Sequence, residues 1–529
     1  MAIASEEAKQ VLKERLFKNF SVEFTARLYY LATRFLLTPI TLTYVTLEEY
    51  GIWAACFILI SYMGMSSMGI ANVYIRFVAE YNAKGEQDKI NRLISTGLVI
   101  TTSICVALMS VLVVCLPRVL HLLKIRPSLS HTASILVLAT AASFMLDLSF
   151  GVFNNTLTGL QKSAQTSVIW AVTVTLEVVT AVILFRTGHG IYSLAWAFGI
   201  RYLVATILMA IFCYRAMPGL SVRLRHFDRT NLRIFFGYGS VVQISGLLCT
   251  FLYSIEKVIA GIFIGVQATA LFDVGEKLPV MGSQLASSMN TVFMPALSHM
   301  NTLTWKDELV KLYLKGARYM NMMTGTLLAF MAAFAHPLLR LWIGSADKFA
   351  PAIPILMIFC LPYQTHVLTG PGSAFHRGVG HPKRELIYPL TQLAFVLLFV
   401  TIGFLTVGKT TLMIAVAVAS GMVLSGLIYM TYTHRIIGVS QPLFLKQVFL
   451  PGLIPYFLAF GLAWALPSIL TGAGSSRIWV AAGLCARGII YLSLVTLVFY
   501  RGLCPWGERE YLRKQALHTL GGLFHGQRA

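Results

Sequence analysis

The sequence has few charged residues and even fewer acids. Asp, Glu, Lys and Arg together make up 12% of its 529 residues, whereas a soluble protein usually carries about 25%. Hydrophobic residues make up 57%, and the mean hydropathy is +0.72. This composition excludes an ordinary soluble multidomain protein. It also excludes an intrinsically disordered chain, because disorder requires low hydrophobicity.

Patterned cysteines, a signal peptide and long polar loops are also absent. The eight cysteines are scattered, mostly in apolar runs, with no CxxC pair and no His/Cys ligand spacing, so we expect no metal site. The charged residues ahead of the first apolar run do not fit a signal peptide. Leu12, Leu16 and Phe20 instead predict an amphipathic helix on the membrane surface. No polar loop exceeds about 20 residues, which leaves no room for a soluble catalytic domain, so the function must lie among the helices.

Long apolar runs are what the chain does have. A bilayer core is spanned by about 20 apolar helical residues, and runs of that length recur along the whole sequence. The pattern predicts an all-α polytopic membrane protein with about 14 transmembrane helices. The predicted spans are 20–45, 49–77, 93–115, 131–160, 165–185, 190–214, 234–265, 267–299, 317–343, 350–376, 385–407, 411–434, 448–470 and 478–500.

The distribution of basic residues predicts the orientation of these spans. The net charge of +21 could indicate a nucleic-acid partner, but Lys and Arg also collect in the cytoplasmic loops of membrane proteins. With the N-terminus in the cytoplasm, 28 bases fall in inner loops and 8 in outer loops. This asymmetry predicts cytoplasmic N- and C-termini and argues against nucleic-acid binding. The outer loop at 118–126 is the one local violation.

A faint internal repeat predicts how the spans are grouped. A shift of 222 residues places Tyr50 on Phe272 and Arg34 on Glu256, so that spans 1 and 2 overlay spans 7 and 8. An even number of spans between the copies predicts parallel repeats with a pseudo-two-fold axis, although chance similarity between apolar segments is an alternative. The predicted organisation is an N-terminal segment (1–19), an N-terminal lobe (20–214), a basic cytoplasmic linker (215–233), a C-terminal lobe (234–434), two further helices (448–500) and a cytoplasmic tail (501–529).

One motif match is judged to be misleading. Residues 403–410 fit the phosphate-loop pattern G-x4-G-K-[ST], which works by joining a strand to the N-terminus of a helix. Here the pattern falls between two predicted transmembrane helices. We therefore interpret Gly408-Lys409 as a turn.

The charges inside the spans are more informative. A charged residue at the centre of a lipid-facing helix costs about 2.5–3.5 kcal/mol or more, so these side chains must face one another, the bundle interior or a cavity. The spans contain six acids and six bases: Glu23, Arg27, Arg34, Asp147, Glu177, Arg201, Glu256, Lys257, Asp273, Glu276, Lys277 and Arg487.

Helical spacing divides these charges into two classes. Glu23/Arg27 and Asp273/Lys277 are four residues apart, so each pair can form a salt bridge within one helix. Arg34, Arg201 and Glu256 have no opposite charge at i±3 or i±4, which favours a role in a cavity. A guanidinium binds phosphate with two parallel hydrogen bonds, and a partly desolvated carboxylate can take up a proton or a cation.

At this point the chain resembles a known family. Tyr50-Gly-Ile-Trp53 and the segment 69–86, Gly-Ile-Ala-Asn-Val-Tyr-Ile-Arg-Phe-Val-Ala-Glu-Tyr-Asn-Ala-Lys-Gly-Glu, resemble the second span and first cytoplasmic loop of bacterial polysaccharide (O-antigen type) flippases. Those proteins belong to the multidrug/oligosaccharidyl-lipid/polysaccharide exporter superfamily. Gly261-Ile-Phe-Ile-Gly265 and Pro295-Ala-Leu-Ser298 are similar to the start of that family's second lobe.

The resemblance implies an inner-membrane flippase with two six-helix lobes and two extra C-terminal helices. Its substrate would be a polyprenyl-pyrophosphate-linked oligosaccharide, such as a lipopolysaccharide O-antigen precursor, moved by ion-coupled alternating access without ATP. Many relatives have an Asp in the middle of span 7, where this chain has Glu256-Lys257, so a proton-coupling role does not carry over directly.

We therefore expect a transporter and no enzyme, with no cofactor and with H+ or Na+ as the coupling ion. The expected partners are lipid-linked oligosaccharide, membrane lipids and the polysaccharide polymerase and export machinery. The candidate substrate-binding residues are Arg27, Arg34, Arg201, Lys257 and Lys277. The candidate ion-coupling residues are Glu256, Asp273 and Glu276.

Three alternatives stay open at this stage. A multidrug or cation antiporter on the same fold would have a more apolar and acidic cavity, whereas Arg27, Arg34 and Arg201 give the first lobe three in-span arginines. A membrane glycan polymerase or ligase usually needs a sizeable outer loop, which this chain lacks. An uncoupled lipid scramblase or a structural subunit is the third alternative.

Overall fold

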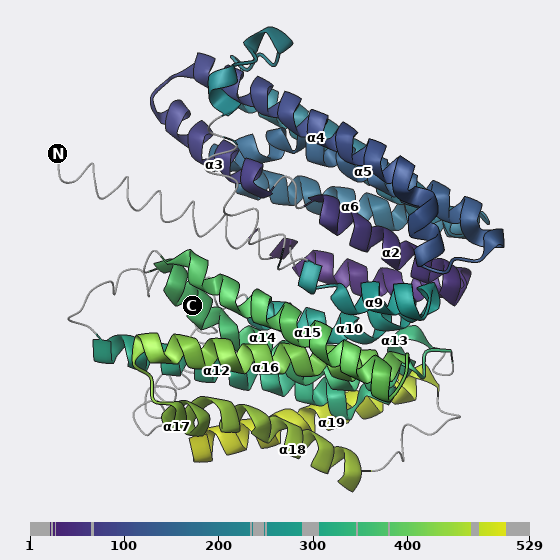
Figure 1. The fold of residues 1–529 in the computed structure, drawn as a ribbon, viewed down its shortest axis with the longest axis vertical. Coiled ribbons are helices and arrows are strands. Elements are labelled where there is room, and N and C mark those ends of the chain that lie inside the picture. Colours follow the sequence, from purple (N-terminus) through teal and green to yellow (C-terminus); the bar gives the residue numbers. More distant parts are fainter. Residues whose placement is uncertain are drawn as a thin grey trace, which may run out of the picture. The chain divides into compact units, whose positions relative to one another are not determined.

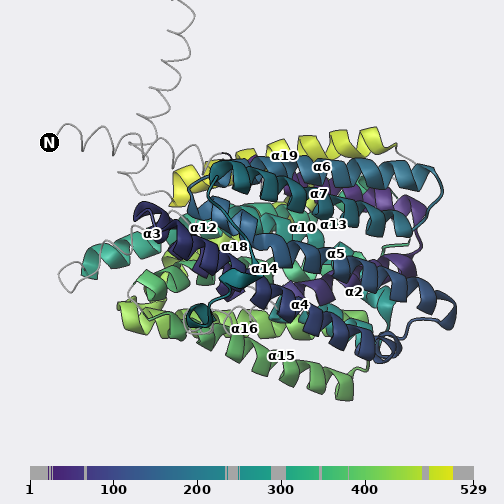
Figure 2. The same ribbon diagram turned by 90° about the horizontal axis from the view of Figure 1, so that it is seen from above.

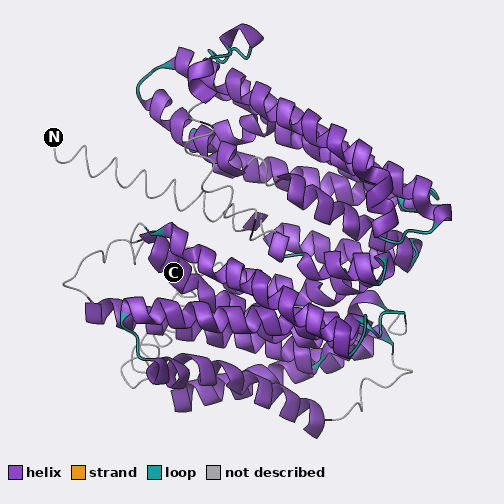
Figure 3. Cartoon of the chain, in the orientation of Figure 1, coloured by secondary structure: helices purple, strands orange, loops and turns teal. Residues whose placement is uncertain are grey.

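Helices are the only regular secondary structure among the described residues (Figure 3). The computed structural model describes residues 22–503 except 23–24, 27, 65–67, 233–234, 236–247, 249–250, 288–305, 345–347, 379–380 and 467–475. Over this part of the chain no strand occurs. The predicted all-α fold class is confirmed. The predicted N-terminal segment (1–19) and most of the predicted tail (501–529) lie outside the described residues.

The first of two compact units contains the described residues up to Val274 together with Val400–Ile414. In this unit α7 packs against α5 and α6, while α5 also packs against α2, α3 and α4 (Figure 1; Figure 2). Its helices are residues 28–44, α2 (Leu47–Gly64), α3 (Met68–Ala83), α4 (Gln87–Leu122), α5 (Pro127–Gly159), α6 (Ser163–Arg186), α7 (Tyr192–Ala216), η2 (Leu224–His226), α9 (Ile255–Phe263) and the first part of α10 (Val266–Ser287).

The second unit contains the remaining described residues from Gly275 onward. In it α12 packs against α14 and α18, and α19 packs against α13 and α18. Its helices are the end of α10, α12 (Lys306–Ala333), α13 (Ala335–Ile343), α14 (Ala352–Gly378), η3 (Pro382–Leu386), α15 (Ile387–Thr406), α16 (Thr411–Ile437), α17 (Gln441–Phe444), η4 (Leu445–Phe449), α18 (Leu450–Ala465), α19 (Arg477–Val498) and η5 (Phe499–Leu503). The residues of α15 and α16 within 400–414 belong to the first unit. The lobe boundaries given above stay a prediction.

Nine helices of the described chain are long and apolar enough to cross a membrane, or ten if one bent pair counts as a single span. The chain is therefore a multi-pass membrane protein. Much of the predicted seventh span (234–265) lies outside the described residues, and the total of fourteen spans stays a prediction. The predicted second span (49–77) corresponds to the two helices α2 and α3.

The predicted span 317–343 is sharply bent, because α12 and α13 meet at 78°. α12 ends at Ala333, and Pro337 lies in the first turn of α13. A proline ring clashes with the carbonyl four residues earlier in a continuous helix, and that carbonyl belongs to Ala333. Pro337 thus favours the start of a new helix over the continuation of α12.

The start of α2 is fixed by a capping box. The hydroxyl of Thr46 accepts a hydrogen bond from the Glu49 backbone N–H at 3.2 Å, and a carboxylate oxygen of Glu49 accepts one from the Thr46 backbone N–H at 2.8 Å. These bonds satisfy two donors that a helix N-terminus leaves free. Four residues into α2, Gly51 lies against the backbone of Val266, and a Cβ there would overlap the Val266 carbonyl oxygen. This glycine lets α2 approach the start of α10.

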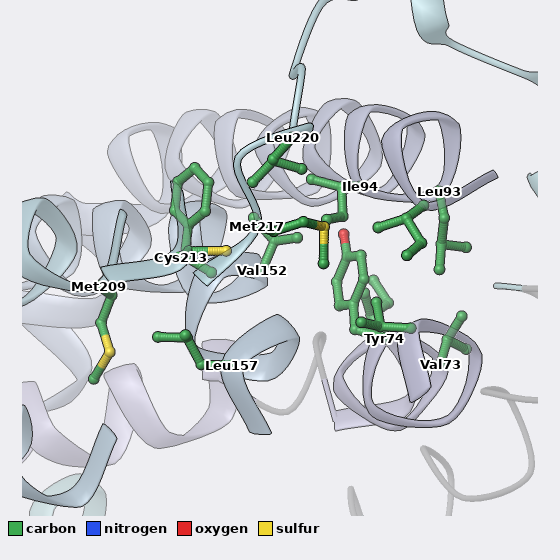
Figure 4. Packing of buried hydrophobic residues seen from close by; sticks show 14 of the residues in the cluster. Val73, Tyr74, Leu93, Ile94, Val152, Leu157, Met209, Cys213, Met217 and Leu220 are labelled. Carbon is green, nitrogen blue, oxygen red and sulfur yellow. The ribbon is translucent and has the colours of Figure 1, made fainter. Parts of the chain in front are cut away.

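A hydrophobic cluster fills one end of the first unit (Figure 4). Tyr74 of α3 lies against Gly97 of α4, where a Cβ would overlap the tyrosine hydroxyl. Met217 and Leu220, which follow α7, are buried in the same cluster with Leu93 and Ile94 of α4. The residues that follow α7 are therefore packed onto the first turns of α4.

Candidate functional site

Three charged side chains from three helices meet inside the first unit. Arg34 donates two hydrogen bonds to Glu177, from Nη1 to Oε1 at 2.8 Å and from Nη2 to Oε2 at 2.7 Å. Arg201 Nη1 donates to Oε2 of the same carboxylate at 2.9 Å. The paired, planar contact of Arg34 with Glu177 is the fork geometry that guanidinium groups form with carboxylates. We call Arg34, Glu177 and Arg201 the arginine cluster.

The turn between α6 and α7 explains why two of these residues meet. Glu177 lies nine residues before the last residue of α6, Arg186, and Arg201 lies nine residues after the first residue of α7, Tyr192. At 1.5 Å per residue both are about 13 Å from the turn. The connection is short, and Gly188 adopts the left-handed region, at φ +86°. Two packed helices joined by such a turn place Glu177 and Arg201 at the same depth.

Aromatic rings surround the arginine cluster. The guanidinium of Arg34 lies 5.0 Å from the ring centre of Tyr30, one helical turn earlier. The guanidinium of Arg201 lies 4.9 Å from the Tyr202 ring and 5.9 Å from the Trp170 ring. Cations are attracted to aromatic faces, and more strongly where water is excluded. The rings therefore help to hold two cations in an apolar environment.

The side chains of the arginine cluster lie in a buried place. The exposed fractions of the Glu177 and Arg201 side chains are 3% and 5%, and that of Arg34 is 15%. Two guanidiniums share one carboxylate, and Asp147 of α5 interacts electrostatically with Arg201. The Nε of Arg34 is buried and has no hydrogen-bond partner among the described residues. The cluster thus holds one buried donor that no described residue satisfies.

The sequence predicted two of the three cluster residues. The sequence favours Arg34 and Arg201 because neither has an opposite charge one turn away, and the structure places both on Glu177. Glu177 is one of the in-span charges but not one of the predicted site residues. The equal distances of Glu177 and Arg201 from their common turn were the signal that could have paired them. Arg27 lies outside the described residues.

A second polar group lies where α2, α9 and α10 meet. The carboxylate of Asp273 accepts a hydrogen bond from the Tyr50 hydroxyl at 2.7 Å and is 3.3 Å from the Lys257 ammonium. The exposed fractions of the Lys257 and Asp273 side chains are 16% and 22%. Asp273 therefore has partners on two other helices, besides the candidate partner Lys277 on its own helix. Tyr50 belongs to the Tyr-Gly-Ile-Trp motif and was not predicted to bind a charge.

An apolar cavity of about 180 Å³ adjoins this group. The hydrocarbon part of Lys257 and the ring of Tyr62 form part of its wall, and the remaining wall comes from α2, the end of α4, α9 and α10. Tyr62 also forms a hydrogen bond with Ser254 at 3.0 Å. The lining residues are Ala55, Ile58, Leu59, Tyr62, Val119, Leu122, Leu123, Lys257, Val258, Ile262 and Thr269.

The remaining candidates are buried acids and one lysine. Glu256 lies in the first turn of α9 with an exposed fraction of 2%. Glu276 of α10 is fully buried in the second unit, and the Tyr363 hydroxyl lies 3.4 Å from its Oε2. Lys277 follows it and is half-buried. No group of three His, Cys, Asp or Glu side chains among the described residues could hold a metal ion.

The phosphate-loop pattern at 403–410 lies between two helices. α15 ends at Thr406 and α16 begins at Thr411, with Gly408 in the left-handed region at φ +96°. The Lys409 ammonium lies 5.2 Å from the ring of Phe263. Because a strand is missing on the N-terminal side, the pattern is a helix-to-helix turn, as predicted.

A family model described as polysaccharide biosynthesis protein matches residues 16–301, which is more than half of the chain. The chain belongs to the polysaccharide biosynthesis protein family. The match covers all the residues of the arginine cluster as well as Lys257, Asp273 and Glu276. No curated protein sequence matches the chain.

Solved structures confirm the fold of this family member. The lipid II flippase MurJ in an inward closed conformation is 13% identical, and the match covers 92% of this chain and 99% of MurJ with a TM-score of 0.70. A multidrug resistance MATE family transporter of the MOP superfamily is 16% identical over 80% of this chain and 98% of its own, with a TM-score of 0.64. A MOP superfamily transporter from Pyrococcus furiosus is 14% identical. The match covers 80% of this chain and 94% of the transporter, with a TM-score of 0.55. The chain thus has the MOP superfamily fold, and its neighbours in structure are transporters and a flippase, in agreement with the expectation that it is not an enzyme.

Proposed function

We propose that the chain is a flippase for a polyprenyl-pyrophosphate-linked oligosaccharide in the bacterial inner membrane, with cytoplasmic N- and C-termini. The observation that carries the proposal is the arginine cluster, which keeps two guanidiniums on one carboxylate inside a membrane-spanning unit. Membership of the polysaccharide biosynthesis protein family and the 28 to 8 distribution of bases support the substrate class and the orientation.

The chemistry of a diphosphate fits this cluster. A buried charge needs pairing or hydrogen bonding, and breaking its pair is costly. When a diphosphate approaches, its oxygens can accept from the Nε of Arg34 and from the outer donors of both guanidiniums, which suit bidentate phosphate contacts. Glu177 keeps the arginines apart and oriented while no substrate is present. In this mechanism Arg34 and Arg201 bind the diphosphate and Glu177 positions them.

Transport against a gradient requires an energy source, and we propose that it is a flow of H+ or Na+. The buried acids Glu256 and Glu276 and the paired Asp273 are the residues proposed to bind the ion. Asp273 is held by Tyr50 and Lys257, so a cation or proton that binds it competes with the Lys257 ammonium. Ion binding there would release Lys257, a proposed second contact for the anionic headgroup.

A multidrug or cation antiporter is less consistent with the same cluster. A cationic drug would have to displace Arg34 or Arg201 from Glu177 to reach that carboxylate, and like charges at short range repel in a medium of low dielectric constant. The solved neighbours include MATE transporters, but at 16% identity that similarity concerns the fold.

Export of surface glycan by cells that carry variants as their only copy tests the proposal. Arg34→Gln and Arg201→Gln are expected to reduce export at least tenfold with normal amounts of protein in the membrane. Arg34→Lys should retain part of it, because it keeps the charge and loses the fork. Arg186→Gln removes an exposed arginine from the end of α6 and should export normally. Normal export by both cluster variants would contradict the assignment.

The coupling ion is tested separately in the same cells. Collapse of the proton gradient, or replacement of sodium by potassium, should stop export by the unmodified protein within minutes. Export that continues without either gradient would show that the flippase is uncoupled, as a scramblase would be. A polysaccharide polymerase and the export machinery are the proposed partners, because they would consume the flipped glycan.

A further inference from the structure

The segment between α7 and α9 contains exposed apolar side chains among arginines. The exposed fraction of Leu224 is 81% and that of Phe227 is 38%. Arg223, Arg225 and Arg229 alternate with them and are also exposed. These five residues, which we call the linker surface, lie outside the predicted spans, where exposure of apolar side chains to water is unfavourable.

The backbone that carries the linker surface is hydrogen-bonded to α4. The Asn91 side chain donates to the Gly219 carbonyl at 3.1 Å and accepts from the Ser221 N–H at 3.0 Å. One turn further along α4, the Ser95 hydroxyl accepts from the Arg223 N–H at 3.2 Å. Three side-chain atoms of α4 and three backbone atoms of the linker are thereby paired, so the linker follows the helix.

The second half of the linker is fixed in the same way. The Thr96 hydroxyl accepts from the Asp228 N–H at 2.9 Å. The Thr230 hydroxyl and N–H both donate to the Asp228 carboxylate, and these bonds hold the pKa of Asp228 below its usual range. The ionised carboxylate lies 3.7 Å from Arg92, an exposed base on α4. Arg92 therefore adds a further cation beside the linker surface.

The attachment points show at which depth the linker lies. Ser95 and Thr96 belong to the first turn of the predicted span 93–115, and Asn91 directly precedes it. Below the linker, Met217 and Leu220 are buried against Leu93 and Ile94 (Figure 4). From the predicted bounds of that span, we expect the linker backbone at the level where hydrocarbon meets headgroups. Leu224 and Phe227 are within reach of acyl chains, and the arginines are within reach of phosphates.

We propose that the linker surface binds the headgroups of anionic glycerophospholipids while Leu224 and Phe227 insert among the acyl chains. Basic residues near an anionic leaflet attract its lipids, and apolar side chains that flank them add interfacial binding. Asp228 is the one acid in the segment 217–232, where it faces Arg92. The charge of the surface thus fits an anionic and not a zwitterionic headgroup. The site does not depend on which cargo the chain transports.

Lipid counting on the full chain tests the proposal. The protein, purified in a neutral detergent, is titrated with dioleoyl phosphatidylglycerol or with dioleoyl phosphatidylcholine, and bound lipids are counted by native mass spectrometry. The unmodified chain should prefer phosphatidylglycerol at least tenfold. A variant with Arg223→Gln, Arg225→Gln and Arg229→Gln should lose that preference, since each basic residue contributes roughly fivefold. Gel filtration and thermal unfolding check that the variant folds.

Two further variants make the test specific. Lys383→Gln, Arg435→Gln and Lys446→Gln remove three exposed bases from the second unit and should leave the preference intact. Leu224→Ser with Phe227→Ser should weaken the binding of both lipids. Glycerol 3-phosphate, the headgroup without chains, should not displace phosphatidylglycerol.

Three results would overturn the proposal. The first is an unchanged phosphatidylglycerol preference in the arginine variant. If that variant also loses binding to a protein, the linker surface binds that protein and not lipid. The second is an equal loss in the control variant, which would indicate a diffuse effect of net charge. The third is full displacement by glycerol 3-phosphate, which would indicate a site for free anions.

Discussion

Glu177 accepts hydrogen bonds from two arginines on two other helices, and this sharing determines how each residue of the cluster contributes. Removing one arginine leaves a balanced pair, whereas removing the carboxylate leaves two buried cations. Sequence reasoning could find Arg34 and Arg201 because charged residues are conspicuous in apolar runs. It could not find their common partner from i±4 spacing, because Glu177 lies 143 residues from Arg34 and 24 residues from Arg201 in the sequence, on a different helix from either.

Because Glu177 is shared by two arginines, we expect its replacement to destabilise the protein more than the replacement of one arginine. Glu177→Gln should destabilise the protein by about 3 kcal/mol or more, the usual cost of leaving a buried charge without its partner. Arg34→Gln should cost clearly less, because Arg201 and Glu177 still neutralise each other. Thermal unfolding in detergent measures both, with Arg186→Gln as a neutral control. If Arg34→Gln lowers the unfolding temperature as much as Glu177→Gln, the cluster does not share its charge in this way.

At the scale of the element, the predicted spans and the observed helices have nearly the same bounds where the bounds follow from hydrophobicity. Spans 131–160, 165–185, 190–214 and 411–434 lie within α5 to α7 and α16, apart from a residue or two at the ends, since only a helix satisfies its backbone in lipid. The bend at Pro337 could not be predicted from the sequence, because its explanation requires the observed start of α13. Hydropathy alone carries no information on where a helix stops inside an apolar run.

Close packing between α12 and α18 gives a prediction at the same scale. A Cβ at Gly452 would overlap the Asn321 side chain, whose Nδ2 donates to the Val448 carbonyl at 2.7 Å. Gly452→Ala should therefore cost about 1–3 kcal/mol, as overpacking of a filled interior does. Gly461→Ala lies on the same helix with no heavy atom within 4 Å, so it should cost nothing and can gain up to about 1 kcal/mol.

Thermal unfolding of the two glycine variants, purified side by side, measures the difference. Equal stability of Gly452→Ala and Gly461→Ala would show that α12 and α18 do not pack as closely as the structure has them. A lower stability of Gly461→Ala would point to an unrecognised neighbour of that helix face.

At the scale of the whole molecule, the family rests on residues 16–301 and the fold on similarity over 92% of the chain, while the orientation in the membrane rests on loop charges. Two bases of the local violation at 118–126 contact neighbouring helices. Lys124 Nζ donates to the Phe263 carbonyl at the end of α9 at 2.7 Å, and Arg126 lies 3.2 Å from Glu48 of α2. Each of these two bases therefore joins two elements of the first unit.

The orientation is tested with single cysteines and a membrane-impermeant maleimide on intact cells. Thr187→Cys, in the turn between α6 and α7, should react from outside, and so should Lys409→Cys. Lys84→Cys, in the turn between α3 and α4, should react only after the membrane is opened. All three positions are exposed, so access is not limited by burial. The reverse pattern would place the termini outside.

The most direct test of the central claim is flipping by purified protein in vesicles. Vesicles that contain a fluorescent polyprenyl-diphosphate oligosaccharide and the unmodified chain should transfer it between leaflets, as read by a quencher added outside. Arg34→Gln and Arg201→Gln should each slow that transfer at least tenfold, while Arg186→Gln transfers at the unmodified rate. Transfer at the unmodified rate by both cluster variants would contradict the claim that the arginine cluster binds the diphosphate.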